Sequence, residues 1–376
     1  MNTEYVIYGW TCSSFSGYGV VGLNYSLYWQ GCAVTAEPHG RAMLAEYDPR
    51  RPLLEDRLAQ AKALQEGLVQ QGSTATVPAP FFVGLGNQLA QQPLNGVWIT
   101  GTPSIAFPTF EDASEVEKHC RRLQQYPLVI VGSSWNRDVL RALDVPAVLC
   151  HQGYDPALFN PSVKESNARP DGRFRVFSGG KAEYRKGQDL VLEAFSIFAE
   201  KHPDAELVAA WSSPWPHLSS SYDGVTRIGS PPKAADGSPD YLAWAQRYGI
   251  NSTQFRVIPP LPNYLMPELL SHIDVAVFPN RVEGGTNLVA MECLACGVPT
   301  ILAAGFGHDD LIKGSDAISF VPGQPNPFWR GSEAEPIVAV LEQLYDNNAA
   351  SISPLSEAWA WPARIDHLTT ILRDFV

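Results

Sequence analysis

The chain has 376 residues, of which 45% are hydrophobic, and this is enough for two globular domains with ordinary cores. Its formal net charge is -12 at pH 7, which argues against a wide nucleic-acid interface because such surfaces need clustered positive charge. No apolar run reaches membrane-spanning length, and the N-terminus lacks the charged-then-apolar order of a signal peptide. We therefore expect a cytoplasmic protein with no integral membrane segment.

The first elements of the chain predict a Rossmann-like half. Residues 5–8 are an apolar run typical of a strand, residues 10–19 are a loop of small residues, and residues 20–29 have helical spacing. The loop carries Gly17 and Gly19 but lacks the third glycine of a dinucleotide-binding fingerprint. The two glycines indicate either a tight turn or a backbone that faces a ligand.

Short strands and helices continue to alternate up to a polar, proline-containing stretch at residues 162–172. We place the linker between two domains in this stretch. The strands expected before the linker cover residues 32–36, 81–85, 96–100 and 127–132.

The first loop after the linker concentrates positive charge in an otherwise acidic chain. It follows an expected strand at residues 174–178 and precedes an expected helix at residues 189–200. Glycine, two or three cations and a following helix N-terminus together make a good diphosphate-binding cradle. The alternative is a solvated basic turn. The candidate residues are Gly180, Lys181, Arg185 and Lys186.

A second strand-loop-helix unit spans residues 275–296, and its loop lies where open α/β sheets bind ligands. Glu283 opens the loop, and Glu292 falls among apolar residues of the helix, so the Glu292 carboxylate needs a buried partner. The vicinal hydroxyls of a ribose would serve. The plainer alternative is a helix-capping acid and a partly exposed Glu. The glycines and amides near the helix N-terminus belong to Gly284, Gly285, Thr286, Asn287 and Leu288.

These two loops resemble the nucleotide-sugar site of the retaining GT-B glycosyltransferases, the family-four group. The family signature has a second acid in a helix that ends in Cys-Gly-Val-Pro, and this chain reads Glu283-Gly-Gly-Thr-Asn-Leu-Val-Ala-Met-Glu292-Cys-Leu-Ala-Cys-Gly-Val-Pro. Eight residues separate the two acids where the family usually has seven. Either the loop carries one extra residue or Gly284 takes the place of the first acid. The family's Gly-Arg and Lys-Gly pairs correspond to Gly180-Lys181 and Lys186-Gly187.

The resemblance implies an α/β fold with two Rossmann-like domains whose parallel sheets face a central cleft. An acceptor-binding domain would cover residues 1–165, and a nucleotide-sugar-binding domain would cover residues 166–355. Residues 356–376 would form a helix that returns to the first domain.

The resemblance also implies roles for the charged residues of the two loops. Lys181 and Lys186, with Arg185 beside them, would stabilise the leaving diphosphate. Glu283 and the amides that follow it would hold the sugar, and Glu292 would bind the ribose.

Other parts of the chain would complete the site in such a family member. Gly17 and Gly19 would let the backbone face the donor diphosphate and the acceptor. Leu261, beside Pro260, would contact the nucleotide base. His39 is the nearest candidate for a histidine that touches the donor sugar in relatives.

Cys293 and Cys296 form a Cys-x-x-Cys without a second pair, so core packing is expected there rather than a metal site.

The implied activity is transfer of a sugar from a UDP- or GDP-type nucleotide sugar to an acceptor hydroxyl, with retention of anomeric configuration and without a metal or other cofactor. The acceptor could be a saccharide, a lipid, a small molecule or a modified DNA base. A catalytically weak nucleotide-sugar-binding module within an assembly is the second hypothesis. The sequence does not specify the oligomeric state.

Overall fold

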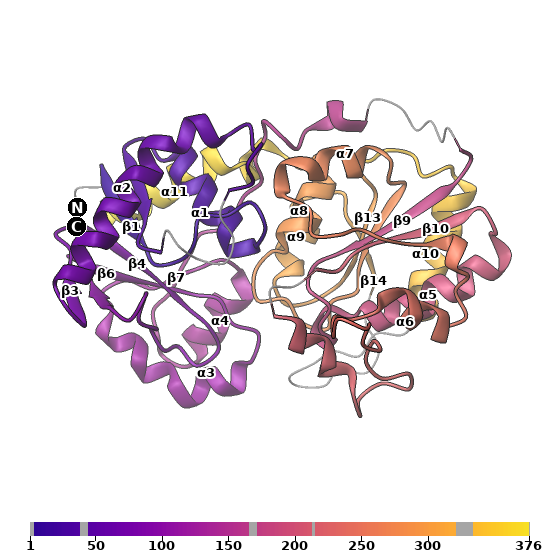
Figure 1. The fold of residues 1–376 in the computed structure, drawn as a ribbon, viewed down its shortest axis with the longest axis horizontal. Coiled ribbons are helices and arrows are strands. Elements are labelled where there is room, and N and C mark those ends of the chain that lie inside the picture. Colours follow the sequence, from indigo (N-terminus) through magenta and orange to yellow (C-terminus); the bar gives the residue numbers. More distant parts are fainter. Residues whose placement is uncertain (1–3, 38–43, 165–170, 213–214, 321–333, 376) are drawn as a thin grey trace.

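The computed structural model describes residues 4–37, 44–164, 171–212, 215–320 and 334–375. The protein has two lobes, each built on a parallel sheet with helices packed against it (Figure 1). The N-terminal lobe contains strands β1 to β8 and the last helix, α11. The C-terminal lobe contains strands β9 to β14.

The N-terminal lobe is organised around a four-stranded parallel sheet in the order β2-β1-β4-β6. A bridge from Ala106 to Val129 places the short parallel pair β7-β8 next to β6, and β3 pairs with β5 separately. The strands are β1 Tyr5–Tyr8, β2 Cys32–Thr35, β3 Thr74–Thr76, β4 Phe81–Leu85, β5 Trp98–Thr100, β6 Ser104–Pro108, β7 Ile130–Val131 and β8 Val148–Leu149. The helices are α1 Gly17–Tyr28, α2 Arg51–Gln70, α3 Ala113–His119, α4 Ser134–Ala142 and α11 Trp361–Asp374.

The C-terminal lobe has a six-stranded parallel sheet in the order β11-β10-β9-β12-β13-β14. Its strands are β9 Phe174–Gly179, β10 Ala205–Ala210, β11 Phe255–Val257, β12 Val275–Phe278, β13 Thr300–Ala303 and β14 Ile318–Phe320. Its helices are α5 Gln188–Lys201, α6 Tyr241–Arg247, α7 Met266–Ser271, α8 Leu288–Ala295, α9 His308–Lys313 and α10 Ala334–Asp346. No helix in the described part of the chain has the length and apolar character needed to cross a membrane.

Burial explains why the central strands read as continuous apolar runs. Every residue of β9, β12 and β13 is buried, because helices cover both faces of the sheet. Cys293 and Cys296 are fully buried in the same core, which confirms the core packing that the sequence predicted, and they are not joined by a disulfide. The carboxyl ends of these strands face the N-terminal lobe, which is where the loops predicted to carry chemistry lie.

Helix α1 begins three residues earlier than its apolar spacing predicted. Ser16 caps it, because the Ser16 hydroxyl accepts a hydrogen bond of 3.2 Å from the amide of Gly19. Gly17 and Gly19 therefore lie in the first helical turn rather than in the preceding loop. A side chain at Gly19 would collide with Ser13, so the close approach of these two backbone segments requires glycine.

The chain returns to the N-terminal lobe at its end. Helix α11, predicted over residues 356–376, begins at Trp361, and Trp361 and Ile365 pack with Tyr8 and Tyr25 in the core of the N-terminal lobe. Just before it, Tyr154 forms a parallel bridge with Ala360. The Tyr154 carbonyl accepts a bond of 2.9 Å from the Trp361 amide, so the two segments that connect the lobes run side by side.

Candidate functional site

A cavity of about 370 Å³ lies between the two lobes at the carboxyl ends of their strands. Residues of both lobes line it, as expected for a ligand site in paired α/β sheets. The predicted site residues that line it are Gly17, Gly180, Lys181, Arg185, Lys186, Leu261, Glu283, Gly285, Asn287, Leu288 and Glu292. A second hollow of about 440 Å³ beside β3 and β5 is open and has no charged lining residue.

Three of the predicted residues that the structure describes do not line this cavity, and a fourth falls outside the described part of the chain. Gly19 packs against Ser13 behind the first turn of α1. Thr286 is fully buried, and its hydroxyl donates to the Met291 sulfur at 3.1 Å. Gly284 faces the N-terminal lobe, and His39 lies outside the described residues.

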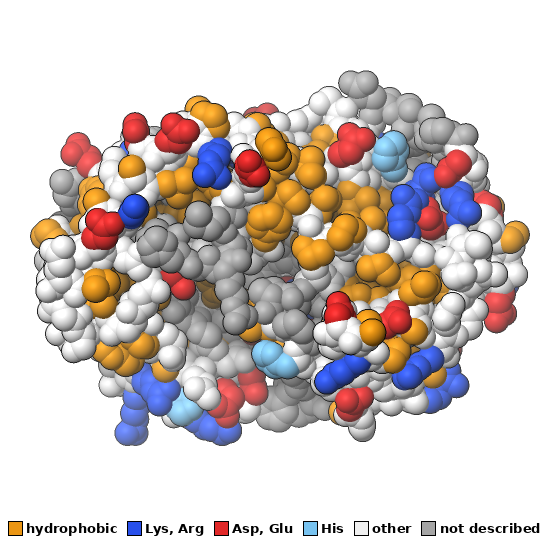
Figure 2. Space-filling model, in the orientation of Figure 1, with side chains coloured by type: hydrophobic (Ala, Val, Ile, Leu, Met, Phe, Trp, Pro, Cys, Tyr) orange, Lys and Arg blue, Asp and Glu red, His pale blue; other side chains and the backbone are white. Residues whose placement is uncertain are grey.

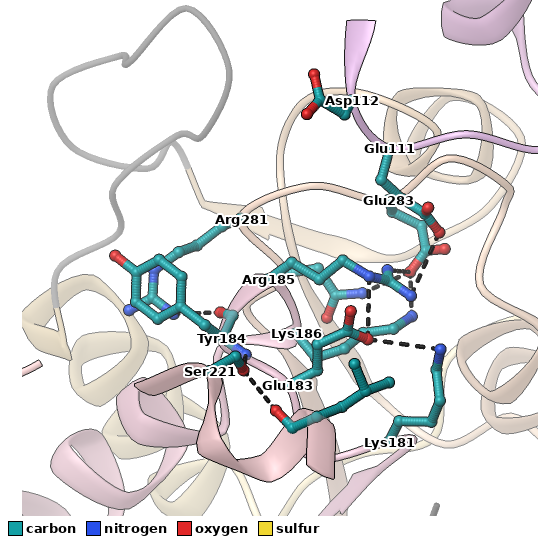
Figure 3. Close-up of polar contacts among 12 residues, drawn as sticks. Glu111, Asp112, Lys181, Glu183, Tyr184, Arg185, Lys186, Ser221, Arg281 and Glu283 are labelled. Atoms are coloured by element: carbon teal, nitrogen blue, oxygen red, sulfur yellow. Dashed lines mark hydrogen bonds and ion pairs between the residues drawn. The ribbon is translucent and has the colours of Figure 1, made fainter. Parts of the chain in front are cut away.

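The basic loop after β9 is shaped by Gly187. This glycine has a φ of 74° and packs against the Pro279 carbonyl, so a side chain there would be both strained and obstructed. The preceding turn, Tyr184–Lys186, directs Lys186 across to the second loop, where its ammonium group forms an ion pair with the Glu283 carboxylate (Figure 3). The two loops singled out in the sequence therefore meet through their charged side chains.

Glu283 is held as a carboxylate. It also accepts a hydrogen bond of 2.7 Å from the Asn280 side-chain amide, and one Arg185 nitrogen lies 3.9 Å from it. Burial alone would raise the pKa of the Glu283 carboxyl, but the charges of Lys186 and Arg185 lower this pKa to about 2. The acid that opens the second loop is thus ionised at neutral pH.

Three cations face three carboxylates around this part of the cavity (Figure 3). Arg185 is buried and lies 3.3 Å from Glu111 of the N-terminal lobe and 3.2 Å from Glu183. Lys181 lies 3.5 Å from Glu183 and 5.2 Å from the centre of the Trp215 ring. The cluster supplies several donors for an anion at the start of α5, where the helix N-terminus adds favourable potential.

Glu292 also lines the cavity, but it lies in a different electrostatic environment. Its carboxyl oxygen accepts a hydrogen bond of 2.6 Å from the Asn263 side-chain amide. Burial raises the pKa of Glu292 to about 8, although this hydrogen bond and the charge of Arg50 oppose the shift. The second acid is therefore mostly protonated at neutral pH while the first is ionised.

Hydrogen bonds to buried residues of the N-terminal lobe hold Asn263, the partner of Glu292, in position. The Asn263 side-chain oxygen accepts a bond of 3.2 Å from Arg50, and its backbone amide donates to the Ser14 carbonyl at 2.7 Å. Arg50 in turn forms a two-bond ion pair with Asp48. Asn263 therefore connects the two lobes.

The N-terminus of α8 is organised by Asn287 and His308. Asn287 adopts a φ of 65° and its side chain lies 3.1 Å from the His308 ring, whose other nitrogen lies 3.1 Å from the Ala303 carbonyl. Burial lowers the pKa of His308 to about 4, so the ring is neutral at pH 7. A neutral His308 can donate to Ala303 and accept from Asn287, which fixes the loop that presents the helix amides.

The lobes are in contact around the cavity. The Ser133 hydroxyl donates to the Gly284 carbonyl at 2.7 Å, and a side chain at Gly284 would collide with the Phe110 carbonyl. Asp310 accepts a bond of 2.6 Å from the Ser134 amide and lies 3.0 Å from the His151 ring. The loop that carries Glu283 is thus packed directly against the N-terminal lobe.

Residues 160–328 match the family described as glycosyl transferases group 1. This segment is a domain of that family. D-inositol 3-phosphate glycosyltransferase 1 of Catenulispora acidiphila is 26% identical over 233 residues, which cover 60% of this chain and 51% of that protein. D-inositol 3-phosphate glycosyltransferase of Paenarthrobacter aurescens is 26% identical over 203 residues, 52% of this chain and 42% of that protein. The chain spans about half the length of the curated relatives it matches.

Solved glycosyltransferase structures share the arrangement of both lobes. Sucrose-phosphate synthase from Thermosynechococcus elongatus superposes with a TM-score of 0.61 at 15% identity, covering 98% of each chain. Anabaena HepE in complex with UDP and glucose gives 0.63 at 12% identity, covering 98% of this chain and 99% of that one. The glycosyltransferase domain is thus part of a GT-B fold, which confirms the predicted fold class.

Some residues of the site carry no local signal in the sequence. Asn263 and His308 follow strands as unremarkable polar residues, and neither belongs to a motif. Arg50 contacts Asn263, although it lies 213 positions before Asn263 in the sequence. Glu111 does so from the loop after β6. The pairing of distant segments reveals their roles, although position after a strand is a signal shared by Glu111 and Asn263.

Proposed function

We propose that the protein transfers a glycosyl group from a nucleotide-diphosphate sugar to an acceptor hydroxyl, with retention of anomeric configuration. The observation that carries the proposal is the joint placement of Lys186, Glu283 and Glu292 on one interlobe cavity, where the cation cluster and a separate carboxyl group both face the space a ligand would fill. The UDP-bound neighbour with the same fold supports a UDP-type donor.

Each part of the donor would be bound by a different set of residues. Lys181, Arg185 and Lys186, together with the amide end of α5, would hold the diphosphate. Glu283 and the amides at the start of α8 would hold the sugar hydroxyls, and Glu292 would hold the ribose. The nucleotide base would lie against Leu261, which lines the same cavity.

In the proposed reaction, the bond between the sugar C1 and the diphosphate oxygen breaks, and its electron pair leaves with the diphosphate. The acceptor oxygen forms the new bond to C1 on the same face, and its proton passes to the departing diphosphate oxygen. Lys186 and Lys181 stabilise the charge that develops on this oxygen, and the cavity orients the two reactants. Among the described residues, no group of three His, Cys, Asp or Glu side chains is arranged as a metal site, and the proposal assigns charge neutralisation to the cations.

Charge distribution bears on the acceptor as well. Figure 2 shows Lys and Arg side chains interspersed with Asp and Glu on the described part of this face, without a broad basic surface. A duplex acceptor would need such a surface. We therefore propose a transferase for an acceptor other than DNA.

Two experiments test the proposal. Thermal-shift measurements with UDP, GDP, ADP and their sugars should show stabilisation by one nucleotide class, because a ligand of the native state raises the Tm. Turnover of the stabilising sugar nucleotide, followed by NMR assignment of the anomeric configuration of the product, then tests transfer and retention. Binding without hydrolysis or transfer would instead identify a nucleotide-sugar-binding module.

A further inference from the structure

The N-terminal lobe forms the wall of the cavity opposite the proposed donor site. The donor groups described above belong to the C-terminal lobe, so the acceptor must approach from this wall. The side chains that line this wall include those of Phe15, Tyr18, Thr109, Glu111 and Gln152. Their chemistry defines which acceptor fits.

Two aromatic rings of this wall are half exposed inside the cavity. Phe15 is 42% exposed and Tyr18 is 40% exposed, whereas most large aromatic residues of this lobe are buried. Both lie at the start of α1, whose first turn is fixed by the Ser16 cap. Exposed aromatic faces bind ligands that have an apolar face and polar edges. A sugar or cyclitol ring has this character, since its C–H bonds form flat apolar faces and its hydroxyls point outward.

The polar members of the wall are positioned to accept hydrogen bonds from hydroxyls. Glu111 is held by Asn87, whose side-chain oxygen accepts from the Glu111 amide at 2.7 Å and from the Asp112 amide at 3.2 Å. Its carboxylate reaches the cavity beside Arg185 (Figure 3). Gln152 lines the cavity next to Gly285. Carboxylate and amide oxygens are good acceptors for sugar hydroxyls.

Charge on this wall is unfavourable for an anionic acceptor. Among the described residues of the N-terminal lobe that line the cavity, Glu111 is the one charged side chain. The nearby Arg50 is buried and bonded to Asp48, Asp155 and Asn263. Arg185 lies 3.3 Å from Glu111, but in the proposed donor complex this cation would bind the diphosphate. A phosphate on the acceptor would therefore face the Glu111 carboxylate and the diphosphate of the donor. Like charges at such distances are a common device for rejecting a wrong partner.

Building on the glycosyl transfer proposed above, we propose that the acceptor is an uncharged polyhydroxyl ring, such as a saccharide unit, that packs on Phe15 and Tyr18 and is held through its hydroxyls by Glu111 and Gln152. The curated relatives are named for an acceptor that carries a phosphate. This chain would thus share glycosyl transfer with them while selecting an acceptor of different charge.

Saturation-transfer NMR on the full chain with saturating UDP tests this selection, because UDP occupies the cation cluster and prevents sugar phosphates from binding there. The probes are matched pairs: glucose and glucose 6-phosphate, mannose and mannose 6-phosphate, and myo-inositol and inositol 3-phosphate. At least one neutral member should show saturation transfer about five-fold stronger than that of its phosphorylated partner. Equal or stronger transfer to the phosphorylated members overturns the proposal, and so does an absence of transfer to every neutral member.

Variants of the wall separate binding of the acceptor from binding of the donor. Phe15→Ala should abolish saturation transfer to the neutral ring and leave the UDP-induced rise in Tm unchanged, whereas Tyr47→Ala, at an 80% exposed aromatic outside the cavity, should change neither. Glu111→Gln should reduce the discrimination against phosphate to about two-fold, and the exposed Glu117→Gln should not. Retained saturation transfer in Phe15→Ala, or retained discrimination in Glu111→Gln, would contradict the assignment. Loss of the UDP effect in the unmodified chain would instead count against the donor site.

Discussion

The side-chain amide of Asn263 donates a 2.6 Å hydrogen bond to Glu292, and the same residue accepts from Arg50 of the N-terminal lobe. Asn263 thereby orients the Glu292 carboxyl group, which lines the cavity, and connects this carboxyl group to the N-terminal lobe. Asn263 itself is 6% exposed, so water does not compete strongly for these bonds. We expect it to act as a positioning residue for the ribose-binding acid.

Replacing Asn263 should therefore weaken donor binding more than turnover. Asn263→Ala leaves the Glu292 carboxyl without its partner, and we expect UDP affinity to fall about ten-fold, which corresponds to about 1.4 kcal/mol. Isothermal titration with UDP measures the effect, and the ratio of the change in KM to the change in kcat separates positioning from chemistry. Asn347→Ala at the protein surface is the control. Unchanged UDP affinity in a folded Asn263→Ala protein would refute this role.

Lys186 should matter for turnover. Lys186→Ala removes the cation nearest the proposed leaving group, and we expect kcat to fall by about 10²–10³. The substitution also leaves Glu283 buried without its ion partner, which destabilises the protein. The double variant Lys186→Met with Glu283→Gln removes both charges and should recover the Tm but not the activity. Lys201→Ala, in a surface ion pair with Glu342, should affect neither, and wild-type turnover in Lys186→Ala would contradict the assignment.

The ionisation of Glu292 predicts a pH dependence of stability. Its pKa in the folded state is raised to about 8, so folding favours the protonated form. This contribution is complete below the ordinary carboxyl pKa and is lost as pH rises through about 8. Glu292→Gln cannot ionise, so its Tm relative to the unmodified protein should increase between about pH 5 and about pH 9. Parallel Tm curves over this range would contradict a buried, protonated Glu292.

Gly284 should be intolerant of a side chain even though it lies in a loop. In Gly284→Ala, the added methyl group would meet the Phe110 carbonyl, and the loop that carries Glu283 would have to move. We expect the lobes to separate slightly and kcat to fall about ten-fold, because small displacements of reacting groups are costly. Small-angle scattering and steady-state kinetics measure the two effects. Gly86→Ala, at an exposed glycine with open space around it, is the matched control, and equal behaviour of the two variants would refute the prediction.

The local pattern of the sequence was enough to predict the loops that carry charge. The apolar run of β12, the glycines after Glu283 and the apolar helix that follows produced a strand-loop-helix prediction, and the structure has strand Val275–Phe278 and helix Leu288–Ala295 there. The pairing of this loop with Lys186 was implied by a family resemblance. It depends on the order β9-β12 in the sheet, which places the two loops side by side.

Contacts between distant segments were not predictable in the same way. Arg50, Asn263 and Ser14 are joined by hydrogen bonds across the boundary between the two lobes, and no spacing in the sequence encodes that network. The stretch at residues 219–238 is rich in Ser, Gly and Pro, a composition typical of a flexible lid or an exposed loop. In the structure Tyr222 is fully buried and its hydroxyl donates to Gln188 at 2.6 Å. Composition alone could not reveal that anchor.

The bridge between Tyr154 and Ala360 has a mechanical consequence. The two segments that connect the lobes are joined by backbone hydrogen bonds at this bridge. The lobes therefore cannot slide past each other without breaking these bonds. Gly153 reinforces this, since a side chain there would obstruct the Trp361 backbone. We therefore expect any opening of the cavity to be a rotation of the lobes about this pair of segments rather than a sliding movement.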